Sequence, residues 1–186
     1  MNIILVSDIF GKTDALEKLS KKLNAKTIVD PYDNEYINFA DENEAYEYFI
    51  KNVGLDNYLK KLKSIVEMAP NNSILIGFSI GASVIWRLSE VILSKQIKSA
   101  VCFYGSQIRN FTDISPRFKI ELIFPKKEEQ FDVEKLEVIL SKKNNVESKI
   151  VKYLHGFMNY YSKNYNQDAY LEYLNLLSMR YVKQWI

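Results

Sequence analysis

The fold of this chain is decided by one stretch of sequence, Ser73-Ile74-Leu75-Ile76-Gly77-Phe78-Ser79-Ile80-Gly81-Ala82-Ser83-Val84-Ile85-Trp86. Its apolar first part is typical of a buried strand, and its apolar last part is typical of a buried helix. Gly77 and Gly81 lack a Cβ atom, so the backbone between strand and helix can turn sharply. This pattern predicts that the Ser79 hydroxyl stands clear of a sheet at the apex of the turn.

Short apolar runs alternate with longer amphipathic ones on both sides of this stretch. The runs predict strands at 2–7, 26–30, 73–78, 99–104, 119–124 and 148–153. Several of them are apolar throughout, as expected when both faces of a parallel sheet are covered. We therefore expect an α/β fold with an open, mostly parallel sheet of about six strands and helices on both faces, in a single domain spanning 1–186.

The amphipathic segments carry helix start signals. Thr13 is expected to cap the first helix, Asp41 with Glu44 has the spacing of a capping box, and Asp132 is expected to cap a later helix. A final helix is predicted from about Gln167 through Trp185.

The composition of the chain indicates which partners and which cellular compartment to expect. The net charge of +2 over 186 residues gives no reason to expect a nucleic-acid partner. The one cysteine, Cys102, excludes an internal disulfide, and one histidine with one cysteine offers too few typical ligands for a metal site. We see neither a signal peptide nor a run of about 20 apolar residues, so we expect a cytoplasmic protein without a membrane partner or a cofactor.

The turn matches the G-x-S-x-G nucleophile elbow, and such a serine needs a base and an acid. The only histidine, His155, follows the last predicted strand, where the carboxyl ends of parallel strands converge on a ligand crevice. The acid should follow the strand at 119–124, and Glu128 is the first carboxylate there. Glu129 is the alternative, since Asp132 is already explained as a helix cap. An oxyanion hole is expected from the Ile80 amide and from the loop at 8–11.

The chain resembles the dienelactone hydrolase family of α/β-hydrolases in four places. These are Asp8-Ile9-Phe10-Gly11, Val29-Asp30-Pro31-Tyr32, the elbow itself, and His155-Gly156-Phe157. The resemblance implies a hydrolase acting on an ester-like bond, with the Ile9 and Ile80 amides in the oxyanion hole and Asp8 beside the nucleophile. The namesake enzymes carry a cysteine where this chain has Ser79. The acid loop reads Pro125-Lys126-Lys127-Glu128 in place of Gly-x-x-Asp, and no arginines match those that hold the lactone carboxylate.

Aromatic residues near the predicted strand ends are candidates to line a substrate pocket for an apolar acyl or alcohol group. They are Phe10, Tyr32, Phe78, Tyr104 and Phe157, with Tyr160 and Tyr161 nearby. We expect a shallow pocket suited to short acyl groups. The chain is thus predicted to be a serine hydrolase for a small ester, thioester or lactone, acting as a monomer or homodimer.

Two other classes stay open at this point. Gly11-Lys12-Thr13 is similar to the end of a phosphate-binding P-loop, although Val6 stands where that motif needs an earlier glycine. The unusual acid loop also fits a hydrolase-fold protein that binds a ligand without catalysis.

Overall fold

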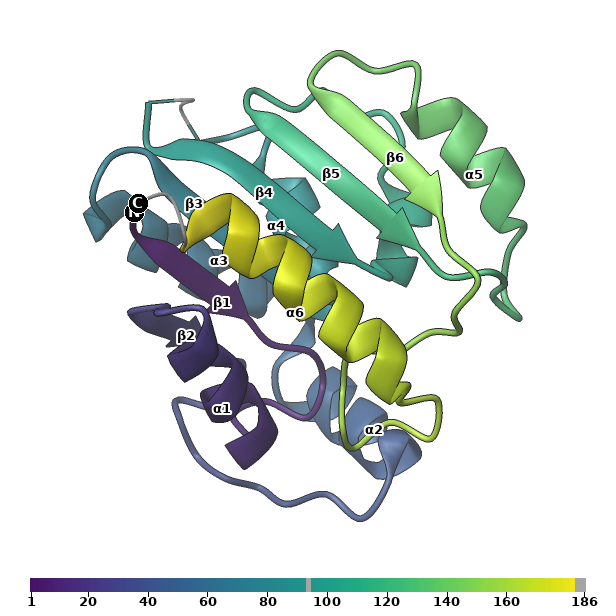
Figure 1. Ribbon diagram of the computed structural model, residues 1–186. Helices are drawn as coiled ribbons and strands as arrows, with labels where there is room; N and C mark the ends of the chain where they lie inside the picture. Colours follow the sequence, from purple (N-terminus) through teal and green to yellow (C-terminus); the bar gives the residue numbers. More distant parts are fainter. Residues whose placement is uncertain (93–94, 183–186) are drawn as a thin grey trace.

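A computed structural model describes residues 1–92 and 95–182 of the chain. The described residues form a six-stranded sheet in which every neighbouring pair is parallel (Figure 1). In the order β2-β1-β3-β4-β5-β6, its strands are Thr27–Val29, Ile3–Val6, Ser73–Phe78, Ile97–Phe103, Lys119–Phe124 and Val146–Ile150. The predicted fold class is confirmed.

The α-helices are α1 (Asp14–Lys22), α2 (Glu42–Asn52), α3 (Gly54–Met68), α4 (Ile80–Leu88), α5 (Val133–Leu140) and α6 (Gln167–Tyr181), with a 3-10 turn η1 at Ser106–Asn110. Of these, α1, α2 and α5 begin directly after the capping residues that the sequence predicts. The side chains of Thr13 and Asp132 accept hydrogen bonds from backbone amides of α1 and α5. Asp41 likewise caps α2, and the Glu44 carboxylate accepts from the amide of Ala40. Trp185, assigned above to the last helix, lies outside the described residues.

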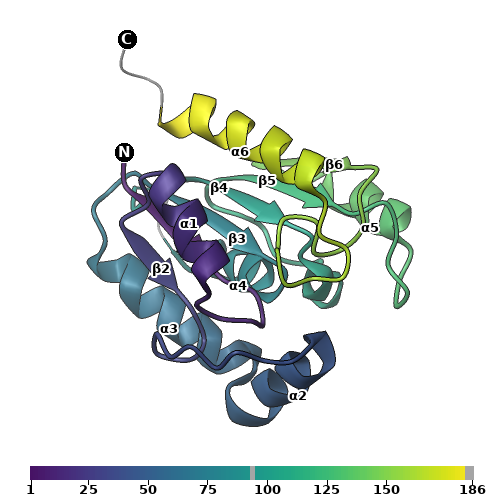
Figure 2. The same cartoon turned by 60° about the horizontal axis from the view of Figure 1, so that its bottom comes forward.

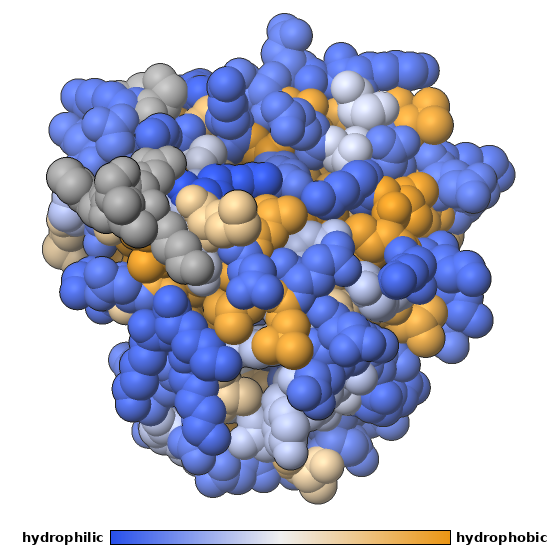
Figure 3. Space-filling view, in the orientation of Figure 1, coloured by the Kyte–Doolittle hydropathy of each residue, from blue (hydrophilic) through white to orange (hydrophobic). Residues whose placement is uncertain are grey.

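Helices cover both faces of the sheet and divide the core in two. On one face, α1 and α6 pack over strand residues such as Leu5 and Ile76. On the other, α3, α4 and α5 pack over residues such as Ile4 and Leu75. Successive residues of one strand serve opposite faces, which is why the central strands are apolar throughout. Figure 3 shows the α6 face of the molecule, where polar side chains surround patches of apolar ones.

Four strands have other bounds than the sequence predicts, and of these β1 and β2 are each one residue shorter at both ends than 2–7 and 26–30. β4 is shifted toward the N-terminus relative to 99–104, and β6 ends at Ile150 instead of continuing to 153. β6 is an edge strand whose residues are half-buried or exposed, so the apolar run at 150–153 misplaces it. His155 therefore lies in a loop beyond the strand.

The carboxyl ends of the parallel strands share one edge of the sheet. Figure 2 brings this edge forward and shows the connecting loops and α2 beside it. The loops that matter below are the β1 loop (7–13), the acid loop (125–132) and the histidine loop (151–166). Among the described residues, the structure has no helix with both the length and the apolar character needed to cross a bilayer.

Candidate active site

The turn at Ser79 has the strained geometry that its glycines predict. Ser79 adopts φ 51° and ψ −112°, a conformation that L-residues rarely take. A Cβ atom on Gly81 would lie 2.3 Å from the Val6 carbonyl oxygen and 2.4 Å from that of Ser7. Because these contacts are with backbone, the turn and the end of β1 can approach this closely only with glycine at position 81. The Ser79 amide donates to the Phe103 carbonyl at 2.9 Å, which fixes the turn to β4 as well.

His155 contacts the serine from the histidine loop. Its Nε2 atom lies 3.0 Å from Ser79 Oγ, a hydrogen-bond distance. Its backbone carbonyl accepts from the Asn164 side-chain amide at 2.9 Å, and its ring lies against that of Tyr104 with centroids 5.0 Å apart. These contacts hold the imidazole toward the serine.

Glu128 contacts the other imidazole nitrogen. Its Oε1 atom lies 2.7 Å from His155 Nδ1, and its side chain is 8% exposed. The acid loop is joined to the histidine loop by the Lys126 amide, which donates to the Tyr153 carbonyl at 2.7 Å. Glu129 is exposed, and Asp132 caps α5. Of the competing carboxylates, the structure therefore places Glu128 at the histidine.

Asp8 ties the β1 loop to the histidine loop. Its Oδ1 accepts from the Phe10 amide at 3.0 Å, and its Oδ2 accepts from the Asn159 side-chain amide at 2.6 Å. Burial raises the pKa of Asp8 to about 6, while these two hydrogen bonds and the nearby His155 act in the opposite direction. Nothing in the sequence marks Asn159 for this contact, because an asparagine in a polar loop is ordinary.

The two amides expected in an oxyanion hole belong to residues that line the same cavity as Ser79. Ile80 is the first residue of α4, so its N–H has no partner within that helix. The backbone of Ile9 is held in place by a hydrogen bond that the Tyr32 hydroxyl donates to the Ile9 carbonyl at 2.6 Å. The amide of Gly11 donates to the Asp8 carbonyl at 3.1 Å, which closes the β1 loop into a turn.

The cavity at the serine, here called the Ser79 pocket, has a volume of about 520 Å³. It is more polar than the sequence predicts, since charged side chains of both signs line it: Asp8, Glu42, Arg109, Lys127, Glu128, Glu129 and Lys163. Glu42, Asn43 and Tyr46 come from α2, and Ser106 and Arg109 come from η1. The helical pattern of α2 gives no sign of which of its faces meets a pocket, so sequence reasoning missed these residues.

The aromatic candidates divide among different places. Phe10 and Tyr104 line the Ser79 pocket. Tyr32 and Phe157, expected there, are core residues with 6% and 0% exposure. The ring of Tyr32 packs against Phe39 and Tyr48, and that of Phe157 packs against Phe103 and Tyr173. Phe78 faces a second cavity, together with Tyr160 and Tyr161.

Lys12 and Thr13 of the Gly11-Lys12-Thr13 stretch make structural contacts with α1. Thr13 caps α1, and Lys12 forms an ion pair with Glu17 of that helix, with 3.3 Å between nitrogen and oxygen. Both groups are thus used in starting α1, and the P-loop interpretation gains no support from their placement.

Comparisons with known proteins agree with the predicted fold. A protein of Bacillus subtilis (strain 168), described as uncharacterized protein YczH, is 28% identical over 183 residues, covering 94% of this chain and 89% of that one. Est1E from Butyrivibrio proteoclasticus has a similar structure, with a TM-score of 0.64, 9% identity and coverage of 97% and 87%. The dienelactone hydrolase-like promiscuous phosphotriesterase P91, from metagenomic libraries, gives a TM-score of 0.61, 12% identity and coverage of 96% and 85%.

These two structures share the fold, and the sequence model of one family covers nearly the whole chain, matching residues 2–181. The chain belongs to the dienelactone hydrolase family of α/β-hydrolases.

Proposed function

We propose that this protein is a serine hydrolase that cleaves a small ester, thioester or lactone through an acyl-enzyme intermediate. The observation that carries the proposal is the continuous chain of hydrogen bonds from Ser79 through His155 to Glu128. Membership of a hydrolase family supports the same reaction class.

In the first half-reaction, Ser79 Oγ attacks the acyl carbon while His155 Nε2 takes its proton. Glu128 keeps the Nδ1 atom protonated and stabilises the imidazolium that forms. The amides of Ile9 and Ile80 stabilise the negative charge on the substrate oxygen, and the imidazolium then donates its proton to the leaving oxygen or sulfur. The products of this step are the acyl-Ser79 ester and a free alcohol or thiol.

In the second half-reaction, water attacks the acyl-Ser79 carbon while His155 again accepts the proton. The same amides stabilise the second oxyanion, and collapse of this intermediate returns the proton to Ser79 and releases the carboxylic acid. A bound lactone opens by the same two steps, with its own alcohol as leaving group.

Replacement of the serine tests the proposal. Wild type, Ser79→Ala and Ser64→Ala are compared on a panel of p-nitrophenyl esters, thioesters, lactones and a phosphotriester. Ser64 is an exposed serine on α3, so its variant controls for the loss of a hydroxyl. We expect Ser79→Ala to lower kcat/KM by up to about 10⁶-fold and Ser64→Ala to leave it unchanged. Hydrolysis by Ser79→Ala at more than a tenth of the wild-type rate would contradict the proposal.

A further inference from the structure

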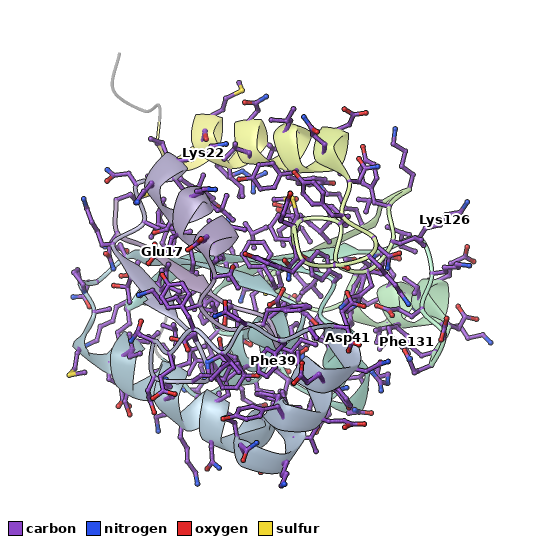
Figure 4. All side chains as sticks on the ribbon, turned by 90° about the horizontal axis from the view of Figure 1, so that it is seen from below. Glu17, Lys22, Phe39, Asp41, Lys126 and Phe131 are labelled. Carbon is purple, nitrogen blue, oxygen red and sulfur yellow. The ribbon has the colours of Figure 1, made fainter. Side chains whose placement is uncertain are left out.

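A second cavity runs along α1 and is called the α1 groove here. Its volume is about 340 Å³, within the range of small-molecule sites. One wall is α1, from Asp14 to Lys22, and the other is the chain from Met158 to Tyr170. Figure 2 shows α1 close to the loop that leads into α6. Figure 4 labels Lys22, whose Nζ lies 5.4 Å from the ring centroid of Tyr170 and so joins the two walls at one end.

The lining of the α1 groove is largely apolar. Its apolar side chains include Leu16 and Leu19 of α1, Met158 of the opposite wall and Phe78 at the end of β3, while Asp14, Lys18 and Lys22 of α1 add charged groups. The opposite wall carries a row of tyrosine rings, with centroids 5.4 Å apart for Tyr160–Tyr165 and 6.0 Å for Tyr165–Tyr170. Such a lining favours a hydrocarbon chain over a compact polar ligand.

The α1 groove shares a wall with the Ser79 pocket. Asp8, Tyr104 and Asn159 line both cavities, and Phe78 directly precedes the serine in the chain. The polar part of this wall is the hydrogen bond from Asn159 to Asp8. The Tyr104 hydroxyl, in a side chain that is 1% exposed, makes no well-formed hydrogen bond to any described residue, although the Met158 backbone lies near it.

We propose that the α1 groove receives the acyl chain of the substrate, which would then be an ester or thioester of an unbranched fatty acid of medium length. This inference rests on the proposed function and replaces the expectation of short acyl groups. The acyl group reacts in both half-reactions, since it is transferred to Ser79 in the first and released to water in the second. A site that binds the acyl chain can therefore stabilise both transition states. The acyl chain of the substrate crosses the shared wall beside Tyr104. For this to happen, the Asn159–Asp8 hydrogen bond breaks, and the two cavities become continuous.

Binding of the product acid tests the groove without any turnover. Butanoate and octanoate are titrated calorimetrically into Ser79→Ala, and into the same variant with Ala15→Phe or Lys21→Phe added. Ala15 lines the groove, whereas Lys21 is exposed on the same helix and does not. The two variants therefore place the same ring inside and outside the cavity, and thermal unfolding monitored by circular dichroism shows whether each is folded. Ala15→Leu is a smaller replacement for use if Ala15→Phe does not fold.

Each methylene fully buried in an apolar site raises affinity about fourfold. We therefore expect Ser79→Ala to bind octanoate at least tenfold more tightly than butanoate, and Lys21→Phe to keep this preference. Ala15→Phe should reduce it to less than about threefold. An equal affinity for the two acids in Ser79→Ala, or an unchanged preference in Ala15→Phe, would overturn the proposal. Tighter binding of 1-octanol than of octanoate would assign the groove to the alcohol portion and overturn it too.

Hydrolysis separates this inference from the proposed function. In the active protein, Ala15→Phe should lower kcat/KM for p-nitrophenyl octanoate at least tenfold and leave that for p-nitrophenyl acetate unchanged. Equal effects on the two esters would refute the acyl groove and leave the serine hydrolase standing. Failure to hydrolyse any ester would instead refute the hydrolase, while the acid titrations would still report on the groove.

Discussion

Glu128 contacts the imidazole from a loop where an aspartate is usual in this family. A glutamate is one methylene longer, so the backbone of the acid loop must lie farther from His155 for the same 2.7 Å contact. The Lys126–Tyr153 backbone hydrogen bond holds the loop at that place. The departure from the family pattern is thus compatible with the same hydrogen bond.

Glu128→Gln is expected to lower kcat/KM by about 10²- to 10⁴-fold, because the uncharged side chain of glutamine does not stabilise the imidazolium as the carboxylate does. Glu129→Gln, the same change on the adjacent exposed residue, should stay within about threefold of wild type. Steady-state kinetics on the best ester of the panel measure both. Equal losses in the two variants would mean that the contact of Glu128 with His155 has no role in turnover.

Asp8 gives a pH dependence whose sign follows from its raised pKa. Its pKa is about 6 in the folded protein and 3.8 ordinarily, so the folded state binds the proton more tightly. The stability from this proton is greatest below pH 4 and is lost as the pH rises through 6. Relative to Asp8→Asn, the wild type should therefore lose on the order of 1–3 kcal/mol of unfolding free energy over that interval.

Urea unfolding of wild type and Asp8→Asn at a series of pH values measures this difference. Other titrating groups are common to the two proteins, so the difference isolates Asp8. A constant difference from pH 4 to 8 would show that the pKa of Asp8 is unshifted.

Single residues were predictable where their chemistry is rare. Ser79 lies in a five-residue motif and His155 is the only histidine, so both could be named from the sequence. Glu128 could be narrowed only to a loop with competing acids. Asn159 could not be found, since its contact with Asp8 joins residues 151 positions apart and leaves no local pattern.

At the scale of elements, the turn between β3 and α4 depends on how closely it packs against β1. Gly81→Ala places a Cβ atom within 2.4 Å of two backbone carbonyl oxygens, which cannot move without shifting β1. We expect a loss of at least about 2 kcal/mol in unfolding free energy and a loss of activity.

Gly54→Ala is the control for this prediction, because Gly54 has φ +72° but no heavy atom within 4 Å of the added Cβ. It should cost only the backbone strain, about 1–2 kcal/mol, and leave activity intact. Denaturant titration and ester hydrolysis of both variants test the pair. A milder effect at Gly81 than at Gly54 would show that the close approach to β1 is not needed.

The starts of α1, α2 and α5 were predictable because capping by Thr13, Asp41 and Asp132 is local chemistry. α3 and α4 begin without a side-chain cap and offered no such signal. The bounds of β6 were not, because an edge strand is only partly buried and its apolar residues do not mark its ends. The pocket-lining face of α2 was also unpredictable, since it depends on tertiary placement.

At the scale of the molecule, the sheet has an apolar core on each face, and the prediction of one domain requires both cores to unfold together. Leu62 on α3 and Leu177 on α6 are each 0% exposed and lie in different cores. Leu62→Ala and Leu177→Ala should each cost about 2–5 kcal/mol. Each variant should unfold in a single transition whose m-value, the slope of unfolding free energy against denaturant concentration, equals that of the wild type.

Circular dichroism and tyrosine fluorescence during urea unfolding measure these transitions. Two separate transitions in either variant would contradict the single-domain prediction. The parallel order of the strands was itself predictable, since it follows from the alternation of strand and helix along the chain. That order alone brings the loops with Ser79, Glu128 and His155 to one edge.

Covalent labelling shows most directly whether Ser79 is an activated nucleophile. The folded protein is treated with a fluorophosphonate, digested, and the modified residue is identified by mass spectrometry. We predict one adduct, on Ser79, that disappears in Ser79→Ala and is strongly reduced in His155→Ala. An unmodified Ser79, or equal modification of Ser106 in the same pocket, would contradict the claim.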